Sequence, residues 1–254
     1  MDIRVICSPA ASGVWNMSVD EAMLDSAANA GNATLRFYQW DPPAVSLGYF
    51  QAVKHREQHS ASRPCDWVRR STGGGAIVHH HELTYCFTWP APARGDISPV
   101  YDLFHDSLVA ALDSINVDTY RCAATISKAP EPFLCFERRA KGDLLLGDHK
   151  VGGSAQRRRR AAALQHGSLL WARSEFAPEL PGITDLASTK LDMDEFRDLW
   201  LEHIRQVRSS RSLRLPGFGP DDTFTSGILS ADELKRANQL SSEQFSAEKW
   251  NEKR

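Results

Sequence analysis

Three consecutive glycines, Gly73, Gly74 and Gly75, are the part of the sequence whose residue types point most directly to chemistry. Adjacent glycines offer no side chain to a core and lose much backbone freedom on folding, so they suit a place where a ligand lies against bare backbone. Their N–H groups can form an anion-binding concavity, and Arg70 just before them could add charge-assisted hydrogen bonds. The alternative is a plain flexible loop. No lysine follows at Walker A spacing, so the segment is not a P-loop.

Three histidines follow the glycines at positions 79–81. Adjacent residues of a strand point to opposite faces, so these imidazoles would not converge on one ion. No further histidine or carboxylate pair is spaced to complete a metal site. We therefore expect no metal here, with one of the three, His79, facing a pocket and the other two in solvent.

Lys150 lies in a second glycine-bearing segment, between the hairpin signal Gly147-Asp148 and the pair Gly152 and Gly153. A lysine on a strand is usually a solvated edge residue. The neighbouring glycines favour a ligand that approaches the backbone closely. A basic group at such a place could bind a phosphate or stabilise a developing oxyanion.

The five cysteines are odd in number and widely spaced, which argues against a disulfide framework and against a cysteine-based zinc site. Cys135 could be a small buried hydrophobe. It differs from the others because a loop precedes it and the Lys150 segment follows, and cationic neighbours favour the nucleophilic thiolate. The run from Arg157 to Arg160 is either a solvated loop or a basic patch for an acidic partner or a phosphorylated carrier arm.

Apolar periodicity places these residues on a set of strands flanked by helices. The first predicted helix covers residues 14–30, with Asn16 or Ser18 as its N-cap and Gly31 as its stop. Short turns join several strands, which favours an α+β (mixed α/β) fold with a mixed, largely antiparallel sheet. The other predicted helices cover residues 100–115, 192–208 and 230–251, and a connector is predicted at 216–222. The main predicted strands cover residues 33–40, 44–49, 66–70, 82–89, 117–122 and 161–171. The last of these strands is expected to contain a polar insert at 165–168.

The bulk composition excludes several classes of protein. A formal net charge of −2 argues against a nucleic-acid-binding surface along the chain. No apolar run approaches the roughly 20 residues of a membrane helix, and the first residues do not resemble a signal peptide. At 254 residues the chain is long enough for one large domain, and we expect a cytoplasmic protein without a membrane or nucleic-acid partner.

Several motifs, taken in order, resemble the lipoate/biotin protein ligase and octanoyltransferase superfamily. They are the segments 16–22, 35–51, 69–79 with 82–85, 147–158 with 164–170, and 245–250. The resemblance implies a single catalytic domain over residues 1–254 with a helical C-terminal segment at 190–254, and a class II synthetase-like fold. It implies an acyl pocket under the glycine loop, with Lys150 contacting the acyl carbonyl or an acyl-adenylate. The substrate-binding residues it implies are Arg70, Gly73, Gly74, Gly75, His79, Gly152, Gly153, Ser154, Ala155, His166 and Gly167, and we expect Arg70 and His79 at the rim of an acyl tunnel.

Two chemistries compete within this superfamily. In the cysteine-type octanoyltransferases an enzyme cysteine carries the acyl group as a thioester, and Cys135-Phe136, Asp143 and the residues 150–156 match their pattern. The resemblance then implies octanoyl-acyl carrier protein as donor, a lipoyl domain or glycine cleavage H protein as acceptor, and no cofactor. Lipoate-protein ligases instead use ATP and Mg, and the residues 138–142 and the full glycine triplet leave that alternative open. A third reading is a non-catalytic acyl- or carrier-binding protein.

Overall fold

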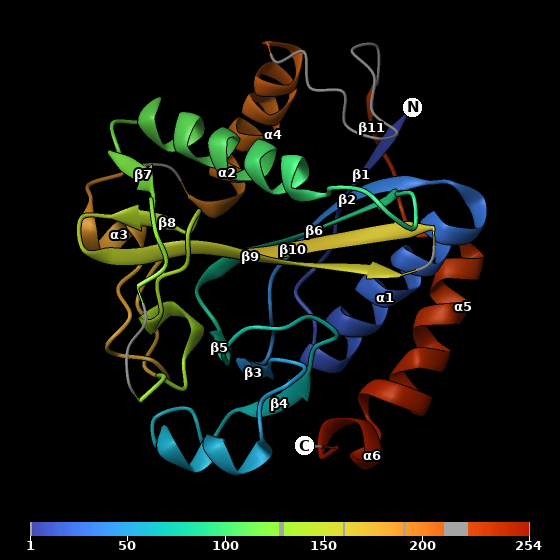
Figure 1. The fold of residues 1–254 in the computed structure, drawn as a ribbon, viewed down its shortest axis with the longest axis horizontal. Coiled ribbons are helices and arrows are strands. Elements are labelled where there is room, and N and C mark those ends of the chain that lie inside the picture. Colours follow the sequence, from blue (N-terminus) through green and yellow to red (C-terminus); the bar gives the residue numbers. More distant parts are fainter. Residues whose placement is uncertain (1, 127–129, 160, 190–191, 211–222, 254) are drawn as a thin grey trace.

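The protein is built around an eight-stranded mixed sheet (Figure 1). A computed structural model describes residues 2–126, 130–159, 161–189, 192–210 and 223–253. The strand order is β11-β1-β2-β6-β10-β9-β8-β7. The pairs β11-β1 and β1-β2 are parallel, and the pairs from β2 to β7 are antiparallel. The strands are β1 (Ile3–Cys7), β2 (Ala33–Tyr38), β6 (Glu82–Pro90), β7 (Thr119–Arg121), β8 (Leu144–Leu146), β9 (His149–Arg159), β10 (Ala162–Leu170) and β11 (Phe224–Ser226).

A second, three-stranded sheet lies below the large sheet in Figure 1 and has the order β4-β3-β5. Its strands are β3 (Ala44–Leu47), β4 (Asp66–Arg69) and β5 (Ile77–His79). The glycine loop connects β4 to β5, so this sheet positions it. Two 3-10 helices, η1 (Val53–Gln58) and η2 (Cys135–Glu137), complete this part of the molecule.

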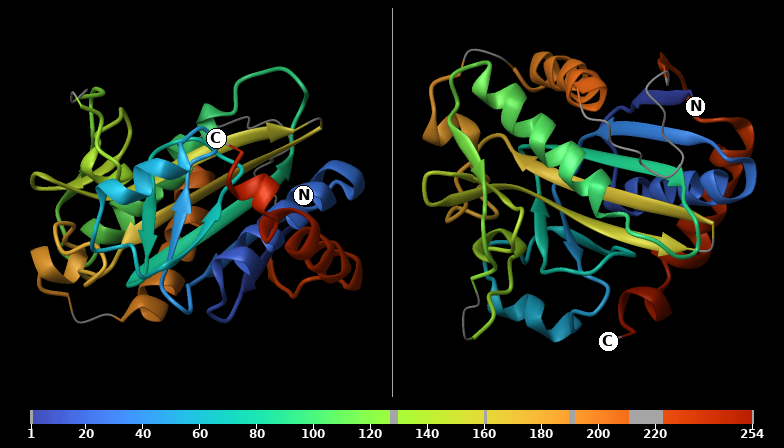
Figure 2. Two further views of the ribbon diagram at one scale, coloured as in Figure 1. Left: turned by 90° about the horizontal axis from the view of Figure 1, so that it is seen from below. Right: turned by 45° about the horizontal axis from the view of Figure 1, so that its top comes forward.

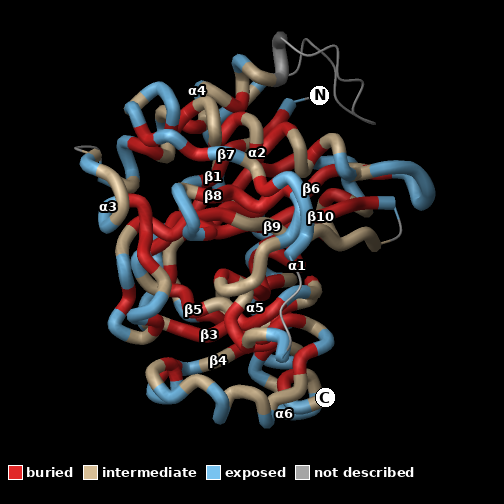
Figure 3. The backbone as a smooth tube through the Cα atoms, turned by 60° about the vertical axis from the view of Figure 1, so that its left-hand side comes forward, coloured by how far each residue is buried: buried red, intermediate tan, exposed pale blue. Residues whose placement is uncertain are grey.

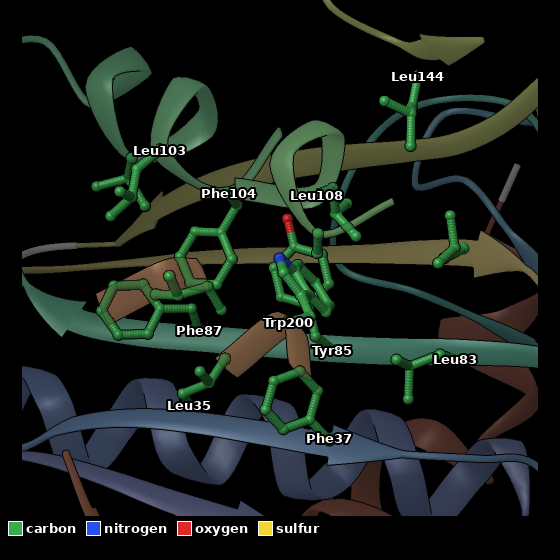
Figure 4. Packing of buried hydrophobic residues seen from close by; sticks show 14 of the residues in the cluster. Leu35, Phe37, Leu83, Tyr85, Phe87, Leu103, Phe104, Leu108, Leu144 and Trp200 are labelled. Atoms are coloured by element: carbon green, nitrogen blue, oxygen red, sulfur yellow. The ribbon is translucent and has the colours of Figure 1, made fainter. Parts of the chain in front are cut away.

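Helices cover both faces of the large sheet (Figures 1 and 2). The residues at odd positions of β6, from Leu83 to Trp89, pack against α2 (Ser98–Asp113) and α4 (Met193–Ser210), as Figure 4 shows for Tyr85, Phe104 and Trp200. Cys86, at an even position, joins the core formed with α1 (Gly13–Ala30) and α5 (Ala231–Leu240). The predicted fold class is confirmed. The remaining elements are α3 (Ile183–Leu186), the short π-helix η3 (Ser241–Phe245) and α6 (Glu248–Asn251).

The first helix begins and ends for identifiable reasons. The Ser12 side chain accepts a hydrogen bond from the N–H of Trp15, and Gly31 ends the helix with φ 73°, where a glycine is favoured. The predicted N-caps are wrong, because both lie inside the helix. The Asn16 amide donates to the carbonyls of Ala11 and Gln39, and the Ser18 hydroxyl donates to a carbonyl one turn earlier.

Two further predictions need correction. Residues 165–168 are not an insert, because β10 runs unbroken and pairs with β6 and β9 on either side. The predicted helix over 230–251 is broken into α5, η3 and α6. The predicted connector at 216–222 lies outside the described residues.

The buried backbone follows the two sheets and the inner sides of the helices (Figure 3). The run of arginines is not a solvated loop, because Arg157 and Arg159 lie in β9 and both reach the buried Glu21 carboxylate of α1 at 2.7 Å. Arg160 lies outside the described residues. None of the helices in the described ranges is long and apolar enough to cross a membrane.

Candidate active site

A largely apolar cavity lies between the two sheets and contains about 540 Å³ of empty space, the open solvent at its mouth included. Strands β2, β3, β5, β6, β9 and β10, helix α1 and the glycine loop contribute to its wall. The residues that line it include Met17, Tyr38, Trp40, Ser46, Arg70, Gly73, Gly74, Ile77, His79, Thr84, Cys135, Phe136, Lys150, Gly153, Ser154, Ala155, His166, Gly167 and Ser168.

Cys135 and Lys150 meet in the wall of this cavity. The Lys150 Nζ atom lies 3.8 Å from Cys135 Sγ and 3.4 Å from the Cys135 carbonyl oxygen. The same ammonium donates to the Asp143 carboxylate at 2.8 Å, and both of these side chains are 4% exposed. Cys135 itself is half-buried and a free thiol. A cation next to a thiol stabilises the thiolate, which is the nucleophilic form.

The strand geometry explains why Lys150 reaches the cysteine. The register between β8 and β9 shifts at Leu144 and Leu145, which displaces the start of β9 relative to its neighbour. The Lys150 side chain then bends over Gly153, where a Cβ would lie only 2.8 Å from Lys150 Cε. Asp143 is held in turn by the Ala140 N–H, which donates to its carboxylate at 2.6 Å. A glycine at position 153 is therefore a steric requirement of the Lys150 position.

The glycine loop is joined to the cysteine segment through backbone hydrogen bonds. The Cys135 N–H donates to the Ala76 carbonyl at 2.7 Å. Gly74 has φ 96°, and a Cβ there would lie 3.7 Å from Cys135 Sγ. At Gly75 an added Cβ would lie 2.9 Å from the Cys135 nitrogen. The loop can approach the cysteine segment because Gly75 has no side chain, whereas a Cβ at Gly74 would make only an ordinary contact with the thiol.

Arg70 holds the glycine loop from inside the protein. Its guanidinium donates to the carbonyls of Gly73 and Gly75, both at 2.7 Å, and to the Ser46 carbonyl at 2.9 Å. Burial lowers the pKa of Arg70 to about 10. The expectation that Arg70 lies at the rim is wrong, because its side chain is buried beneath the loop. It organises the loop by binding its carbonyl groups.

His79 supports Arg70 through a chain of hydrogen bonds. Its Nδ1 lies 2.6 Å from the Glu82 carboxylate and its Nε2 lies 2.7 Å from the Ser46 hydroxyl. A carboxylate only accepts, so Nδ1 carries the proton and Nε2 accepts from Ser46. Burial lowers the pKa of His79, which favours this neutral form. The imidazole also stacks on Trp40 with ring centroids 3.6 Å apart. His79 therefore lies in the buried wall and not at the rim.

His166 is part of a second buried network on the α1 side of the cavity. Its Nε2 lies 2.6 Å from the Thr72 hydroxyl and its Nδ1 lies 3.3 Å from the Asp20 carboxylate. Asp20 also accepts from Arg36 at 3.0 Å and from the Tyr38 hydroxyl at 2.8 Å. This network ties helix α1 to the residue that precedes the glycine triplet.

Ser154 belongs to a third network, centred on a histidine that sequence reasoning missed. His105, in α2, places Nδ1 2.7 Å from the Gly142 carbonyl and Nε2 2.7 Å from the Ser154 hydroxyl. The carbonyl only accepts, so Nε2 accepts the Ser154 proton and the Ser154 oxygen accepts from Tyr85 at 2.8 Å. Burial lowers the pKa of His105 to about 3. The Ser154 hydroxyl proton is thus directed to His105 and not into the cavity.

The structure brings most of the expected site residues to the cavity, with two exceptions. Gly152 packs against Leu144 behind the wall, and Gly75 faces a separate outer hollow. Sequence reasoning missed Asp20, Trp40 and His105 as parts of the site. A signal existed for His105, since it shares the apolar face of its helix with Leu108 and Leu112. Within the described residues, no group of three or more metal-ligating side chains is present.

Comparison with known proteins agrees with this geometry. The family model of the lipoyl protein ligase A/B catalytic domain matches residues 12–176. Octanoyltransferase LipM of Kyrpidia tusciae is 29% identical over 98% of this chain and 97% of its own length. Octanoyltransferase LipM of Symbiobacterium thermophilum is 32% identical over 94% of both chains.

Solved structures share the fold. A proposed lipoate protein ligase from T. acidophilum with bound lipoic acid superposes over the full length of both chains with a TM-score of 0.80 at 21% identity. Lipoate-protein ligase A bound with ATP gives a TM-score of 0.77 at 20% identity, over 99% of both chains. At these identities the solved structures show the fold. The matched family model covers more than half of the chain, and the chain therefore belongs to the lipoyl protein ligase A/B catalytic domain family.

Proposed function

We propose that this enzyme is an octanoyltransferase of lipoate biosynthesis that works through a thioester on Cys135. The octanoyl group would come from octanoyl-acyl carrier protein and pass to a lysine of a lipoyl-carrier protein, either the glycine cleavage H protein or a lipoyl domain. The observation that carries the proposal is the 3.8 Å separation of Cys135 Sγ and Lys150 Nζ in the wall of an apolar cavity. The relatives named octanoyltransferase support acyl transfer over non-catalytic binding.

The first half-reaction forms the acyl-enzyme. The Cys135 thiolate attacks the thioester carbonyl of the donor, a new S–C bond forms, and the donor thiolate leaves and takes up a proton. The Lys150 ammonium lies beside the attacking sulfur and can stabilise the tetrahedral oxyanion, for which one donor is typically worth about 3 kcal/mol. Exchange between two thioesters is nearly isoenergetic, so this step needs no ATP. The octanoyl chain would fill the apolar cavity.

The second half-reaction transfers the acyl group. The neutral amine of the acceptor lysine attacks the Cys135 thioester, an amide bond forms, and the Cys135 thiolate leaves. The proton lost by the amine is taken up by solvent or by the departing thiolate. Because the thioester supplies the driving force for the amide, we propose no cofactor.

Intact-mass analysis after incubation with octanoyl-acyl carrier protein tests this proposal. The wild-type protein should gain one octanoyl group, and Cys135→Ala should abolish the gain. Cys7→Ala is the matched control, because Cys7 is an exposed free thiol outside the cavity and its loss should leave the adduct intact. A wild-type protein that forms no adduct but lipoylates an acceptor with ATP and free lipoate would instead be a ligase.

A further inference from the structure

A second hollow lies on the outer side of Cys135. It is open to solvent and contains about 840 Å³ of empty space, part of which is open solvent. Gly74, Cys135 and Lys150 line both this outer hollow and the acyl cavity, so the thiol lies where the two spaces meet. Any donor whose acyl chain fills the inner cavity and whose carbonyl reaches Cys135 must leave the rest of its molecule in the outer hollow.

The outer hollow is rich in positive charge. Arg138 and Arg139 line it together with Lys150, whose ammonium is paired with Asp143, and among the described residues Glu131 is the one carboxylate in the lining. Arg138 follows Cys135 in the same turn, where its N–H donates to the Cys135 carbonyl at 3.1 Å. Both guanidinium groups are therefore positioned by the segment that carries the nucleophile.

The present partners of these arginines are weak competitors for a ligand. Arg138 pairs with Glu131, which is 70% exposed, and its Nε donates to the Pro132 carbonyl. Arg139 donates to the Asp148 carbonyl and lies 3.8 Å from the carboxylate of that residue, which is 93% exposed. Pairs with exposed carboxylates contribute little to stability. To the described residues, the Arg138 guanidinium makes two hydrogen bonds with its five N–H donors, which leaves donors for a planar, bidentate contact.

The arginines of the other basic segment, residues 157–159, already bind groups within the protein. Arg157 and Arg159 lie in β9 and neutralise the buried Glu21 carboxylate. Arg158 donates to the carbonyls of Ala93 and Gly95. None of these three residues lines the outer hollow.

We propose that Arg138 and Arg139 bind a phosphate group on the thioester-bearing arm of the acyl donor. The inference rests on the proposed function, since it takes the rest of the thioester donor as the occupant of the outer hollow. The ligand chemistry is a phosphate held by two guanidinium groups, with charge-assisted hydrogen bonds of the kind that arginine makes to such oxygens. The donor is thus recognised at both ends, by its apolar chain inside and by its phosphate outside.

Two non-transferable probes test the site directly. S-octyl-4′-phosphopantetheine and S-octyl-pantetheine share the chain and the arm and differ only in the phosphate. Isothermal titration of the wild-type protein should show that the phosphorylated probe binds at least roughly tenfold more tightly, the size expected of one charge-assisted contact. Arg139→Ala should lower this affinity ratio several-fold, because only Arg138 remains to bind the phosphate, and Arg138→Lys should reduce it by less.

A variant that is expected to raise the affinity ratio of the two probes distinguishes phosphate binding by the arginines from a merely structural role. Glu131→Gln removes the competing carboxylate, so the affinity ratio should rise above that of the wild type. Arg205→Ala is the matched control, because this arginine pairs with Glu202 on α4 and does not line the hollow, and the ratio should not change. A titration with inorganic phosphate tests whether the site recognises the phosphate as part of the arm. The phosphorylated probe should bind more tightly than inorganic phosphate. Equal affinities would indicate a site for free anions and would overturn the proposal.

The outcomes separate this inference from the proposed function. Equal affinity of the wild-type protein for the two probes overturns the phosphate site, whatever the catalytic result. So does a fall in affinity for both probes in Arg139→Ala with an unchanged ratio. The absence of a Cys135 adduct in the intact-mass experiment overturns the proposed function, whereas the affinity ratio still decides whether the outer hollow binds phosphate.

Discussion

At the scale of single residues, the site depends on glycines, which have no side chain, as much as on Cys135 and Lys150. Cys135 and Lys150 approach each other because Gly75 leaves room for the Cys135 backbone nitrogen and Gly153 leaves room for the bent Lys150 side chain. The glycines differ in how strictly they are required. Gly74 has a positive φ, whereas an added Cβ at Gly73 would meet only the Phe50 ring, at 3.9 Å.

This difference makes a matched pair of substitutions informative. Gly74→Ala places a Cβ at φ 96° and 2.9 Å from the Arg70 guanidinium, so it should lower the free energy of unfolding by about 1–2 kcal/mol and strongly slow the acylation of Cys135. Gly73→Ala should leave both quantities nearly unchanged. Urea denaturation and the rate of adduct formation measure the two effects. Equal behaviour of the two variants would contradict the requirement for a glycine at position 74.

At the scale of elements, the periodicity of apolar residues predicted the helices and strands that pack through apolar faces. It did not predict the roles of polar residues whose hydrogen-bond partners lie on other elements. The alternation of residues 82–89 predicted β6, and the apolar spacing of residues 100–115 predicted α2, because in each segment the large apolar residues share one face. The polar residues 165–168 suggested an interruption of β10. Their hydrogen-bond partners, such as Glu82 for Ser168 and Asp20 for His166, come from elements far away in the sequence. A pattern of local spacing carries no information about such partners.

His105 shows how one element controls another. It connects α2 to the Gly142 carbonyl, next to Asp143, which binds Lys150. Its direct partners were not predictable, because they lie in the turn before β8 and in β9. The hydrogen-bond partners of His105 determine its tautomer, and burial lowers its pKa. Helix α2 thus contributes to the position of Lys150 without touching the cavity.

The buried His105 should make the protein less stable in acid. Burial lowers its pKa in the folded state to about 3, whereas in the unfolded chain it is near 6.5. The unfolded state therefore binds a proton first, and stability that is fully present above pH 6.5 is lost as the pH falls towards 3. Between pH 7 and pH 4 the wild type should lose on the order of 3 kcal/mol more than His105→Gln. Urea denaturation at the two pH values measures this, and parallel losses would contradict it.

At the scale of the whole molecule, the site is assembled from segments that lie far apart in the chain. The motifs in order predicted the family, and the structure places residues from all of them except the segment 245–250 in the wall of one cavity. The spacing of residues in the sequence did not predict that the glycine loop depends on contacts with the C-terminal helix. Helix α6 lies beside β4, where the Trp250 indole donates to the Arg69 carbonyl at 2.8 Å. Arg69 in turn donates to the carbonyls of Gly48 and Gln51, and an added Cβ at Gly48 would lie 1.9 Å from the Gly74 oxygen.

Asn251 should therefore affect a loop that it does not touch. Its side chain accepts from the Arg69 N–H at 2.9 Å, and its own amide donates to the Phe245 carbonyl at 2.8 Å. Asn251→Ala leaves a buried N–H without its acceptor, which should lower the free energy of unfolding by about 1–3 kcal/mol and slow the acylation of Cys135. Asn251→Asp keeps the acceptor and should recover part of the rate, and the exposed Lys249→Ala should have no effect. If Asn251→Ala loses stability but acylates at the wild-type rate, α6 stabilises the fold without positioning the glycine loop.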